Sequence, residues 1–182
     1  MVCLDIDHPD VEKFIGWKVR EEQKVAALVV GSRLCHDGLN DIMRIAYEGK
    51  STDVRKNKEL GIAIRRAMAN NVPVNYILRV IQLVEQGKKE IDFPVFDTNY
   101  NSEAYLTVSG QNSNNSIRIS NKFIDAVLND DDWELRFRTI DKVAKKTTAR
   151  KLWDTIAQAA WHSADPGVQY DDTINEWHTC PK

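Results

Sequence analysis

Residues 109–116, SGQNSNNS, form the densest run of hydrogen-bonding side chains in the sequence. An apolar run at 105–108 precedes them, and a second apolar run begins at Ile117. Amide and hydroxyl groups without a formal charge suit contact with a polar ligand. They are equally typical of a loop that only caps strands, because polar loops are common at strand ends. The candidate ligand contacts in this run are Asn112, Asn114, Asn115 and Ser116.

Metal binding and cysteine chemistry have weaker support. His178 and Cys180 are one residue apart, and His162 lies upstream. A zinc site needs four ligands at recognisable spacing, and only Cys35 and His36 could add to these, so no metal site is predicted. Cys180 with His162 or His36 is the candidate pair of nucleophile and base. Nothing in the sequence supplies the nearby base and the positive field that a catalytic thiolate needs.

Phosphate binding has one candidate, the basic run 142–146 with Arg136 and Arg138 upstream. Without interleaved aromatic residues, such a run is more often a solvated face. The eight glycines form neither GxGxxG nor GxxxxGK, so no phosphate-cradling loop is predicted. All the tryptophans occupy apolar or near-apolar positions and are predicted to be core residues: Trp17, Trp133, Trp153, Trp161 and Trp177.

The composition is that of one soluble globular unit: 182 residues, 42% hydrophobic and 29% charged. The net charge of −2 gives no overall attraction to nucleic acid or to an anionic membrane. The longest apolar run, 25–30, is too short to span a membrane. Three separated cysteines without a CxxC pair favour a reducing, cytoplasmic location.

The elements that position these residues begin with a strand. Val2, Leu4 and Ile6 alternate with polar residues over 1–7, which predicts a strand with one apolar face. The sequence Asp-His-Pro-Asp at 7–10 then predicts a helix start, because proline suits the first helical turn and aspartate complements the positive end of the helix dipole.

Residues 37–87 are predicted to be wholly helical, because three apolar stripes recur there at helical spacing. The stripes cover 39–46, 60–68 and 74–84, and they end in turn at Gly49, before Pro73 and at Gly87. The charged segment 50–58 between the first two is expected to be exposed. The remaining elements are predicted in this order: a loop or edge strand at 91–97, a short helix after the N-cap Ser120, a half-buried strand at 133–137, a helix capped by Thr147 or Thr148, and a short strand from Val168.

Six stretches of the sequence resemble the adenosylcobalamin-dependent (class II) ribonucleotide reductases. They are MVCLDIDHPDVEKFI at 1–15, WKVREEQKVAAL at 17–28, NYILRVI at 75–81, DTNYNSEAYLTVSGQNSNNS at 97–116, AWHSADPG at 160–167 and WHTCP at 177–181. They occur in the family's order and cover nearly the whole chain. The combined match is therefore specific, although no single short motif would be.

The resemblance implies a reductase that makes 2′-deoxyribonucleotides from ribonucleoside diphosphates, a step in DNA replication, through a cysteine thiyl radical that adenosylcobalamin generates. The protein's task is to position and shield that radical. The implied fold is a ten-stranded α/β barrel. This chain is expected to form a partial barrel of class α+β or α/β, with about three strands near 1–7, 104–119 and 167–175 and a helical insertion between the first two.

The resemblance also predicts that the chain is an internal fragment, inactive alone. A Gly-Gly-Arg-Arg-type loop is expected just upstream of Met1, and the catalytic Asn-Pro-Cys-Ser-Glu motif shortly after 177–180. None of the five prolines is followed by Cys-Ser-Glu, so no catalytic residue and no metal ligand is assigned. The cysteines given no such role are Cys3, Cys35 and Cys180. Residues 112 and 114–116 would then help to shape a nucleotide or cofactor pocket.

The expected domain pieces are 1–35, a helical insertion at 36–92, and 93–182. The expected partners are the rest of the reductase chain, a ribonucleotide substrate and an allosteric nucleotide, with no direct nucleic acid, no membrane and no adenosylcobalamin bound by the fragment alone. Strand edges left unpaired predict self-association. Two alternatives stay open: a helical binding or interaction module at 36–90 without catalysis, and a small cysteine-dependent enzyme.

Overall fold

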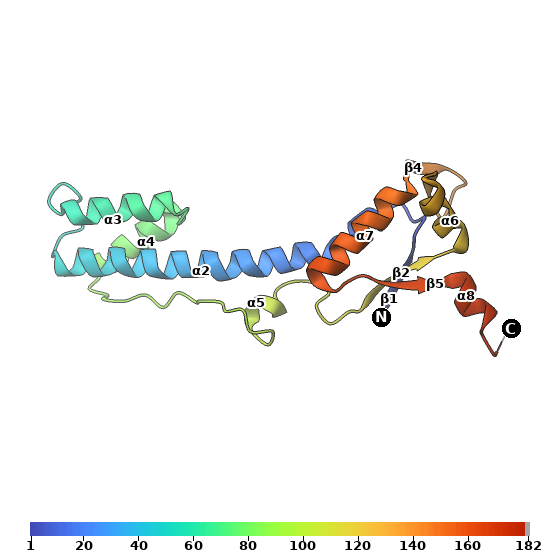
Figure 1. Ribbon diagram of the computed structural model, residues 1–182. Helices are drawn as coiled ribbons and strands as arrows, with labels where there is room; N and C mark the ends of the chain where they lie inside the picture. Colours follow the sequence, from blue (N-terminus) through green and yellow to red (C-terminus); the bar gives the residue numbers. More distant parts are fainter. Residues whose placement is uncertain (181–182) are drawn as a thin grey trace. The chain divides into compact units, whose positions relative to one another are not determined.

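The computed structural model describes residues 1–180, which form two compact units. Unit 1 consists of residues 1–24 and the chain from 108 onwards, and unit 2 consists of Val25–Thr107 (Figure 1). The fold is mixed α/β, as predicted, with the parallel strands in unit 1 and the long helices mainly in unit 2. The three pieces predicted from the sequence, with boundaries at 36 and 93, remain a prediction about domains.

Three parallel strands form the sheet of unit 1 in the order β1-β2-β5: β1 (Val2–Asp5), β2 (Asn115–Ile119) and β5 (Gly167–Tyr170). The three predicted strands are therefore present. The predicted bounds 104–119 are wrong in their first part, because Glu103–Leu106 is the short helix α5 and β2 begins only at Asn115. The polar run between them contains Gly110 at φ +68°, a backbone conformation that suits a turn.

The third strand is also shorter than predicted. It ends at Tyr170 rather than near residue 175, and α8 (Asp171–Glu176) follows directly. Asp171 and Asp172 lie in the first turn of that helix, where carboxylates complement the dipole.

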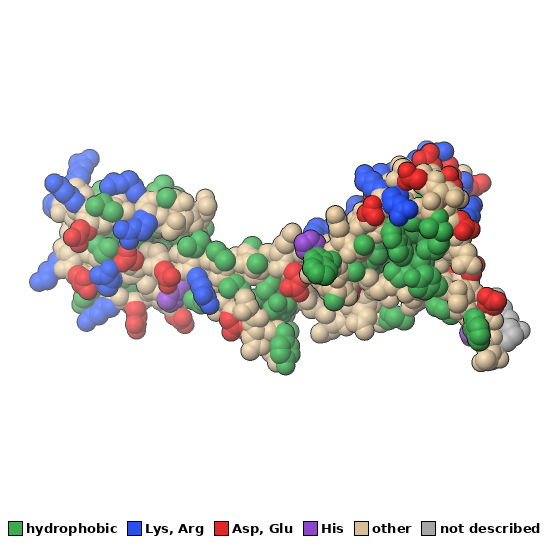
Figure 2. All heavy atoms as spheres, in the orientation of Figure 1, with side chains coloured by type: hydrophobic (Ala, Val, Ile, Leu, Met, Phe, Trp, Pro, Cys, Tyr) green, Lys and Arg blue, Asp and Glu red, His purple; other side chains and the backbone are tan. Residues whose placement is uncertain are grey.

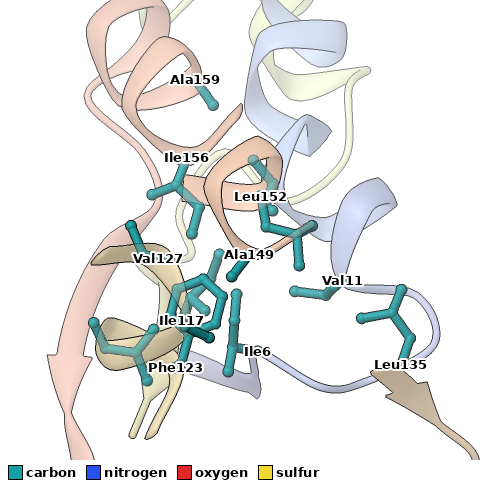
Figure 3. Close-up of a cluster of buried hydrophobic side chains, with 13 residues drawn as sticks. Ile6, Val11, Ile117, Phe123, Val127, Leu135, Ala149, Leu152, Ile156 and Ala159 are labelled. Atoms are coloured by element: carbon teal, nitrogen blue, oxygen red, sulfur yellow. The ribbon is translucent and has the colours of Figure 1, made fainter. Parts of the chain in front are cut away.

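Three helices cover one face of the sheet: α1 (Val11–Ile15), α6 (Asn121–Asn129) and α7 (Ala149–Ser163). Ile117 and Ile119 point from the central strand toward them and are almost completely buried. Figure 3 shows this core, with Phe123 of α6 and Leu152 of α7 packed against the strand residues. Two predicted caps are confirmed: Ser120 Oγ accepts a hydrogen bond from Phe123 N, and Thr148 Oγ1 accepts one from Lys151 N, each at 3.3 Å.

An antiparallel hairpin of β3 (Asp132–Arg136) and β4 (Val143–Thr148) lies between α6 and α7 in sequence. The strand near 133–137 was predicted, but β4 was not, because its sequence VAKKTT has no clear alternation of apolar and polar residues. The hairpin is attached to the end of β1, since Arg136 N donates to Asp7 O at 2.8 Å and Trp133 Nε1 donates to Ile6 O at 3.3 Å.

The prediction that all five tryptophans are core residues is wrong for two of them. Trp161 is 87% exposed and Trp177 is 79% exposed, whereas the other three are partly buried. Trp161 lies nine positions after the buried Leu152 on α7, and nine positions are two and a half turns at about 3.6 residues per turn. The side chain of Trp161 therefore points away from the core.

Unit 2 is built on the second half of α2 (Trp17–Glu48), with α3 (Lys58–Ala69) and α4 (Val74–Glu85). The three predicted stripes lie on these helices, although α2 is one continuous helix from residue 17. Its core includes Leu39, Leu60 and Val80. Residues 88–98 contain no strand, so the loop was the correct alternative at 91–97. Within the described residues, no helix is both long and apolar enough to cross a membrane.

Candidate functional site: the polar face of the sheet

The second face of the three-stranded sheet carries polar side chains. Because side chains alternate along a strand, the residues between the core positions point to this face. They form two rows in register across the strands: Cys3, Ser116 and Gly167 in one row, and Asp5, Arg118 and Gln169 in the next. Among the described residues, none of these six positions carries a buried hydrophobic side chain.

The first row consists of small residues and forms a shallow trough. The side chain of Gln169, from the next row, reaches across this trough. Cys3 Sγ donates a hydrogen bond to Gln169 Oε1 at 3.1 Å, although β2 lies between the two strands. Gln169 Nε2 in turn lies 3.4 Å from Met1 Sδ. A Cβ atom on Gly167 would stand 3.4 Å from Ser116 Oγ, so the glycine keeps the trough open.

The second row ends in a group of charges at the carboxyl ends of the strands, the edge where open parallel sheets bind ligands. Arg118 Nε lies 3.6 Å from Asp171 Oδ1 and 4.0 Å from Asp5 Oδ1, too far for hydrogen bonds. Arg118 thus lies between two carboxylates, and its terminal nitrogens form no ion pair with the residues that the structure describes.

Arg138, from the hairpin loop, reaches the same edge. It donates hydrogen bonds to both carboxylate oxygens of Asp7 and lies 3.3 Å from Asp5 Oδ2. The hydrogen bond from Arg138 holds the pKa of Asp7 below its usual range, although partial burial opposes that shift. This arrangement fixes an ionised carboxylate beside the end of β1.

The polar run 109–116 lies at the opposite, amino-terminal end of the strands, just before β2. Side chains of α2 form hydrogen bonds with its first half. Trp17 Nε1 donates to Ser109 Oγ at 3.3 Å, and Lys18 Nζ donates to Gln111 O at 3.0 Å. Ser109 N donates to Glu21 Oε2 at 3.1 Å. Glu21 is only 5% exposed, and hydrogen bonds from Lys24 and then Ser109 hold its pKa below the usual range.

The four candidates within this run do not converge on one place. Asn112 and Asn114 are exposed, whereas Asn115 and Ser116 are buried at the start of β2 on opposite faces of the strand. Of the four, only Ser116 belongs to the polar face of the sheet. Their assignment to a substrate pocket stays a prediction.

Asn115 has a buried amide nitrogen without a hydrogen-bond partner. Ser113 Oγ lies 3.0 Å from both Gly110 O and Asn115 Oδ1, but a hydroxyl donates only one hydrogen bond. If Ser113 donates to Gly110 O, its Oγ is left to accept a hydrogen bond. Turning the Asn115 amide by 180° exchanges its oxygen and nitrogen, so the nitrogen then donates to Ser113 Oγ and has its partner within the turn.

The cysteine and histidine side chains do not combine into a site. Cys3 bonds Gln169, His36 lies 3.0 Å from the neighbouring Asp37, and His178 Nδ1 accepts the backbone N–H of Cys180 at 3.2 Å. Within residues 1–180, no group of three His, Cys, Asp or Glu side chains could hold a metal ion.

The basic run that was considered for phosphate contact is largely paired with acidic side chains. Lys145 pairs with Glu12, and Lys146 pairs with Glu134 at 2.8 Å. Such pairing favours the alternative of a solvated face.

Sequence reasoning missed most of the polar face. The signal was present as the alternation of Cys3 and Asp5 with apolar residues in the first strand, and of Arg118 with isoleucines in the second. What the sequence did not give was the register that brings the three strands together.

Fold and site together define a mixed α/β protein with a small parallel sheet, covered by helices on one face and polar on the other. The family model for the ribonucleotide reductase barrel domain matches residues 1–182. The chain belongs to this family.

Individual relatives agree with the family match. The chain is 52% identical over 186 residues to a vitamin B12-dependent ribonucleotide reductase of Agrobacterium fabrum. The aligned region covers 100% of the chain and 15% of the relative. It is 51% identical over 185 residues to the protein of the same name from Bradyrhizobium diazoefficiens, over 99% of the chain and 15% of the relative. A vitamin B12-dependent ribonucleoside-diphosphate reductase of Thermoplasma acidophilum is 32% identical over 102 residues, 51% of the chain and 13% of the relative. The chain thus spans about 15% of the length of the first two relatives.

Proposed function

We propose that this chain is an internal segment of an adenosylcobalamin-dependent ribonucleotide reductase, which makes 2′-deoxyribonucleotides by thiyl-radical chemistry. The observation that carries the proposal is the identity of 51–52% along nearly the whole chain to reductases named for vitamin B12 dependence. Alone, the segment is inactive, because the Asn-Pro-Cys-Ser-Glu motif expected in the family is not among its residues.

In the complete reductase, β1, β2 and β5 are three neighbouring strands of the barrel. A parallel sheet is normally buried on both faces, and here α1, α6 and α7 bury only one. The polar face with Asp5, Arg118 and Gln169 therefore points to the barrel interior, where the nucleotide is reduced. Asn112, Asn114, Asn115 and Ser116 stay candidates for the pocket, and of the four only Ser116 lies on that face.

Adenosylcobalamin supplies the radical when it is bound to the complete enzyme. We place the cofactor against the part of the reductase outside this chain, and we give these strands the task of shaping and shielding the interior. The substrate is a ribonucleoside diphosphate, as the name of the Thermoplasma relative says of that protein. The enzyme would work in the cytoplasm in support of DNA replication.

The test compares the 182-residue chain with the complete reading frame that contains it. Each is assayed with adenosylcobalamin, a dithiol and the ribonucleoside diphosphates, and deoxyribonucleotides are quantified by chromatography. Turnover by the complete protein and none by the chain is expected. Turnover by the chain alone would overturn the claim that it is incomplete, and a complete protein without reductase activity would overturn the function.

A helical binding module is the second candidate, because Val25–Thr107 forms its own compact unit with a separate hydrophobic core. Titration of nucleotides and cobalamin into the chain distinguishes the two functions. The small cysteine-dependent enzyme is the weakest candidate, and a thiol-alkylation profile without a fast-reacting cysteine would remove it.

Self-association belongs to the same proposal. β1 and β5 are the outer strands of the three-stranded sheet, and unpaired edges recruit further strands. Sedimentation velocity at increasing concentration measures this for the isolated chain.

A further inference from the structure

A cavity of about 620 Å³ lies in unit 2, where α2 ends, α3 begins and α4 ends. Its volume is within the range of small-molecule sites, about 300–1,000 Å³. Figure 2 shows Lys and Arg side chains gathered around this end of the helices, at the left of the view. The residues of the wall that could contact a polar ligand are Tyr47, Lys50, Ser51, Thr52, Asp53, Lys56 and Glu85.

Two cations in the wall have no acidic partner. Lys50 and Lys56 form no ion pair with any described residue. Lys50 adopts a φ of +49°, the left-handed conformation that is usual just after a helix, and there Lys50 N donates to Tyr47 O at 3.1 Å and Ser51 N donates to Ala46 O at 3.3 Å. Two ammonium groups without an ion pair among the described residues thus lie beside the same cavity, one of them at the capped end of α2.

The helix dipoles explain only part of this positive charge. Lys50, Lys88 and Lys89 follow the carboxyl ends of α2 and α4, where cations are favourable. Lys56 and Lys58 flank the amino end of α3, where cations are unfavourable. Glu59 in the first turn of α3 offsets part of this unfavourable charge, and a bound anion would offset more of it.

The acidic groups of the wall suit a magnesium ion between protein and phosphate. Thr52 Oγ1 donates to Glu85 Oε1 at 2.9 Å, which puts a hydroxyl beside a carboxylate. Magnesium typically binds one or two carboxylates together with ligand phosphates and water, rather than an all-protein cage. Asp53 Oδ1 accepts the N–H of Arg55 at 2.9 Å and shapes the loop.

Tyr47 adds an aromatic surface to the cavity. Its side chain is partly exposed, and Lys89 Nζ lies 5.2 Å from the ring centre. Lys89 thus covers one face of the ring, and a planar nucleotide base would stack on the other face.

We propose that this cavity binds a magnesium-bound nucleoside polyphosphate. Lys50 and Lys56 hold the phosphates, Thr52 and Glu85 bind the magnesium ion, and Tyr47 stacks on the base. The site lies wholly within Val25–Thr107 and does not depend on the reductase proposal. It would give the helical unit a nucleotide-binding function of its own.

The test is isothermal titration calorimetry on the 182-residue chain with Mg-ATP, with ATP in EDTA, with magnesium tripolyphosphate and with adenosine. Mg-ATP should bind most tightly, tripolyphosphate more weakly, and adenosine not measurably. The double variant Lys50→Ala/Lys56→Ala should weaken Mg-ATP at least tenfold. Tyr47→Leu should weaken Mg-ATP while leaving tripolyphosphate unchanged.

The matched control is Arg65→Ala/Arg79→Ala, which removes two cations of the same unit that do not line the cavity. Circular dichroism checks that each variant keeps its helices. Absence of Mg-ATP binding at millimolar concentration would overturn the proposal, as would equal losses in the lysine variant and the control. Binding that is insensitive to EDTA would remove the magnesium part.

Discussion

At the scale of the residue, the contact between Arg138 and Asp7 links two distant segments of the chain. It joins the hairpin loop to the end of β1, two segments about 130 positions apart in sequence. Because Arg138 lowers the pKa of Asp7, the pair links stability to pH. A carboxylate whose folded pKa is depressed stabilises the fold above its unfolded pKa, and that contribution is lost as the pH falls through the folded value.

Arg138→Ala should lower the free energy of unfolding at pH 7 by about 0.5–1 kcal/mol, since both side chains are partly solvent-exposed and screened. The free energies of unfolding of the variant and the unchanged protein should become more similar below pH 3.8, the ordinary pKa of the carboxyl group, because Asp7 becomes protonated there. Urea denaturation across this pH range measures it. The control is Lys142→Ala, a cation on the same hairpin without an ion pair among the described residues; an equal loss there would contradict the prediction.

Gly110 and Gly31 should respond to alanine with opposite signs. Gly110 has a φ of +68°, and a Cβ atom would stand 3.2 Å from Trp17 Cζ2, so Gly110→Ala should destabilise by about 1–2 kcal/mol. Gly31 lies inside α2 with nothing within 4 Å of a new Cβ, so Gly31→Ala should stabilise by about 0.5–1 kcal/mol. Thermal unfolding of both variants would contradict this account if the two shifts had the same sign.

At the scale of the element, unit 1 depends on helices that pack against one face of a small sheet. α7 contributes Leu152 and Ile156 to that core, and its exposed side carries Trp161. The periodicity of α7 and a cap at Thr147 or Thr148 were predicted from the sequence, and the structure selects Thr148. Which strands it would cover was not, because contacts between distant segments leave no local pattern.

Leu152→Ala should therefore cost about 2–5 kcal/mol, because it leaves a cavity in a core where this side chain is 1% exposed. Gln158→Ala on the exposed side of the same helix should change stability by less than about 0.5 kcal/mol. Guanidinium unfolding monitored by circular dichroism compares the two. Similar effects of both variants would show that α7 does not pack as described.

At the scale of the whole molecule, the two units have separate hydrophobic cores. Leu60 and Val80 belong to the core of unit 2, whereas Ile117 and Phe123 belong to that of unit 1. Local stability should therefore differ between the units, because each buries its apolar surface independently.

Leu60→Ala should speed amide hydrogen exchange in α3, α4 and the second half of α2, while β1, β2 and β5 keep their protection. Hydrogen exchange read by mass spectrometry resolves these segments. Phe123→Ala is the reciprocal variant and should act on unit 1 alone. Equal loss of protection in both units after either change would mean that they unfold as one.

The sequence by itself determined the family, the helical stripes, the cap at Ser120, a cap at Thr147 or Thr148, and the polar run between two apolar segments. These are local or distributed patterns, and each can be recognised without knowing which segments meet. Only the tertiary structure decided the register of three strands far apart in the chain, the contact between Arg138 and Asp7, and the exposure of Trp161. The physical reason is that period-two alternation tells which residues share a face, whereas only packing decides whether that face is covered by helices or left polar.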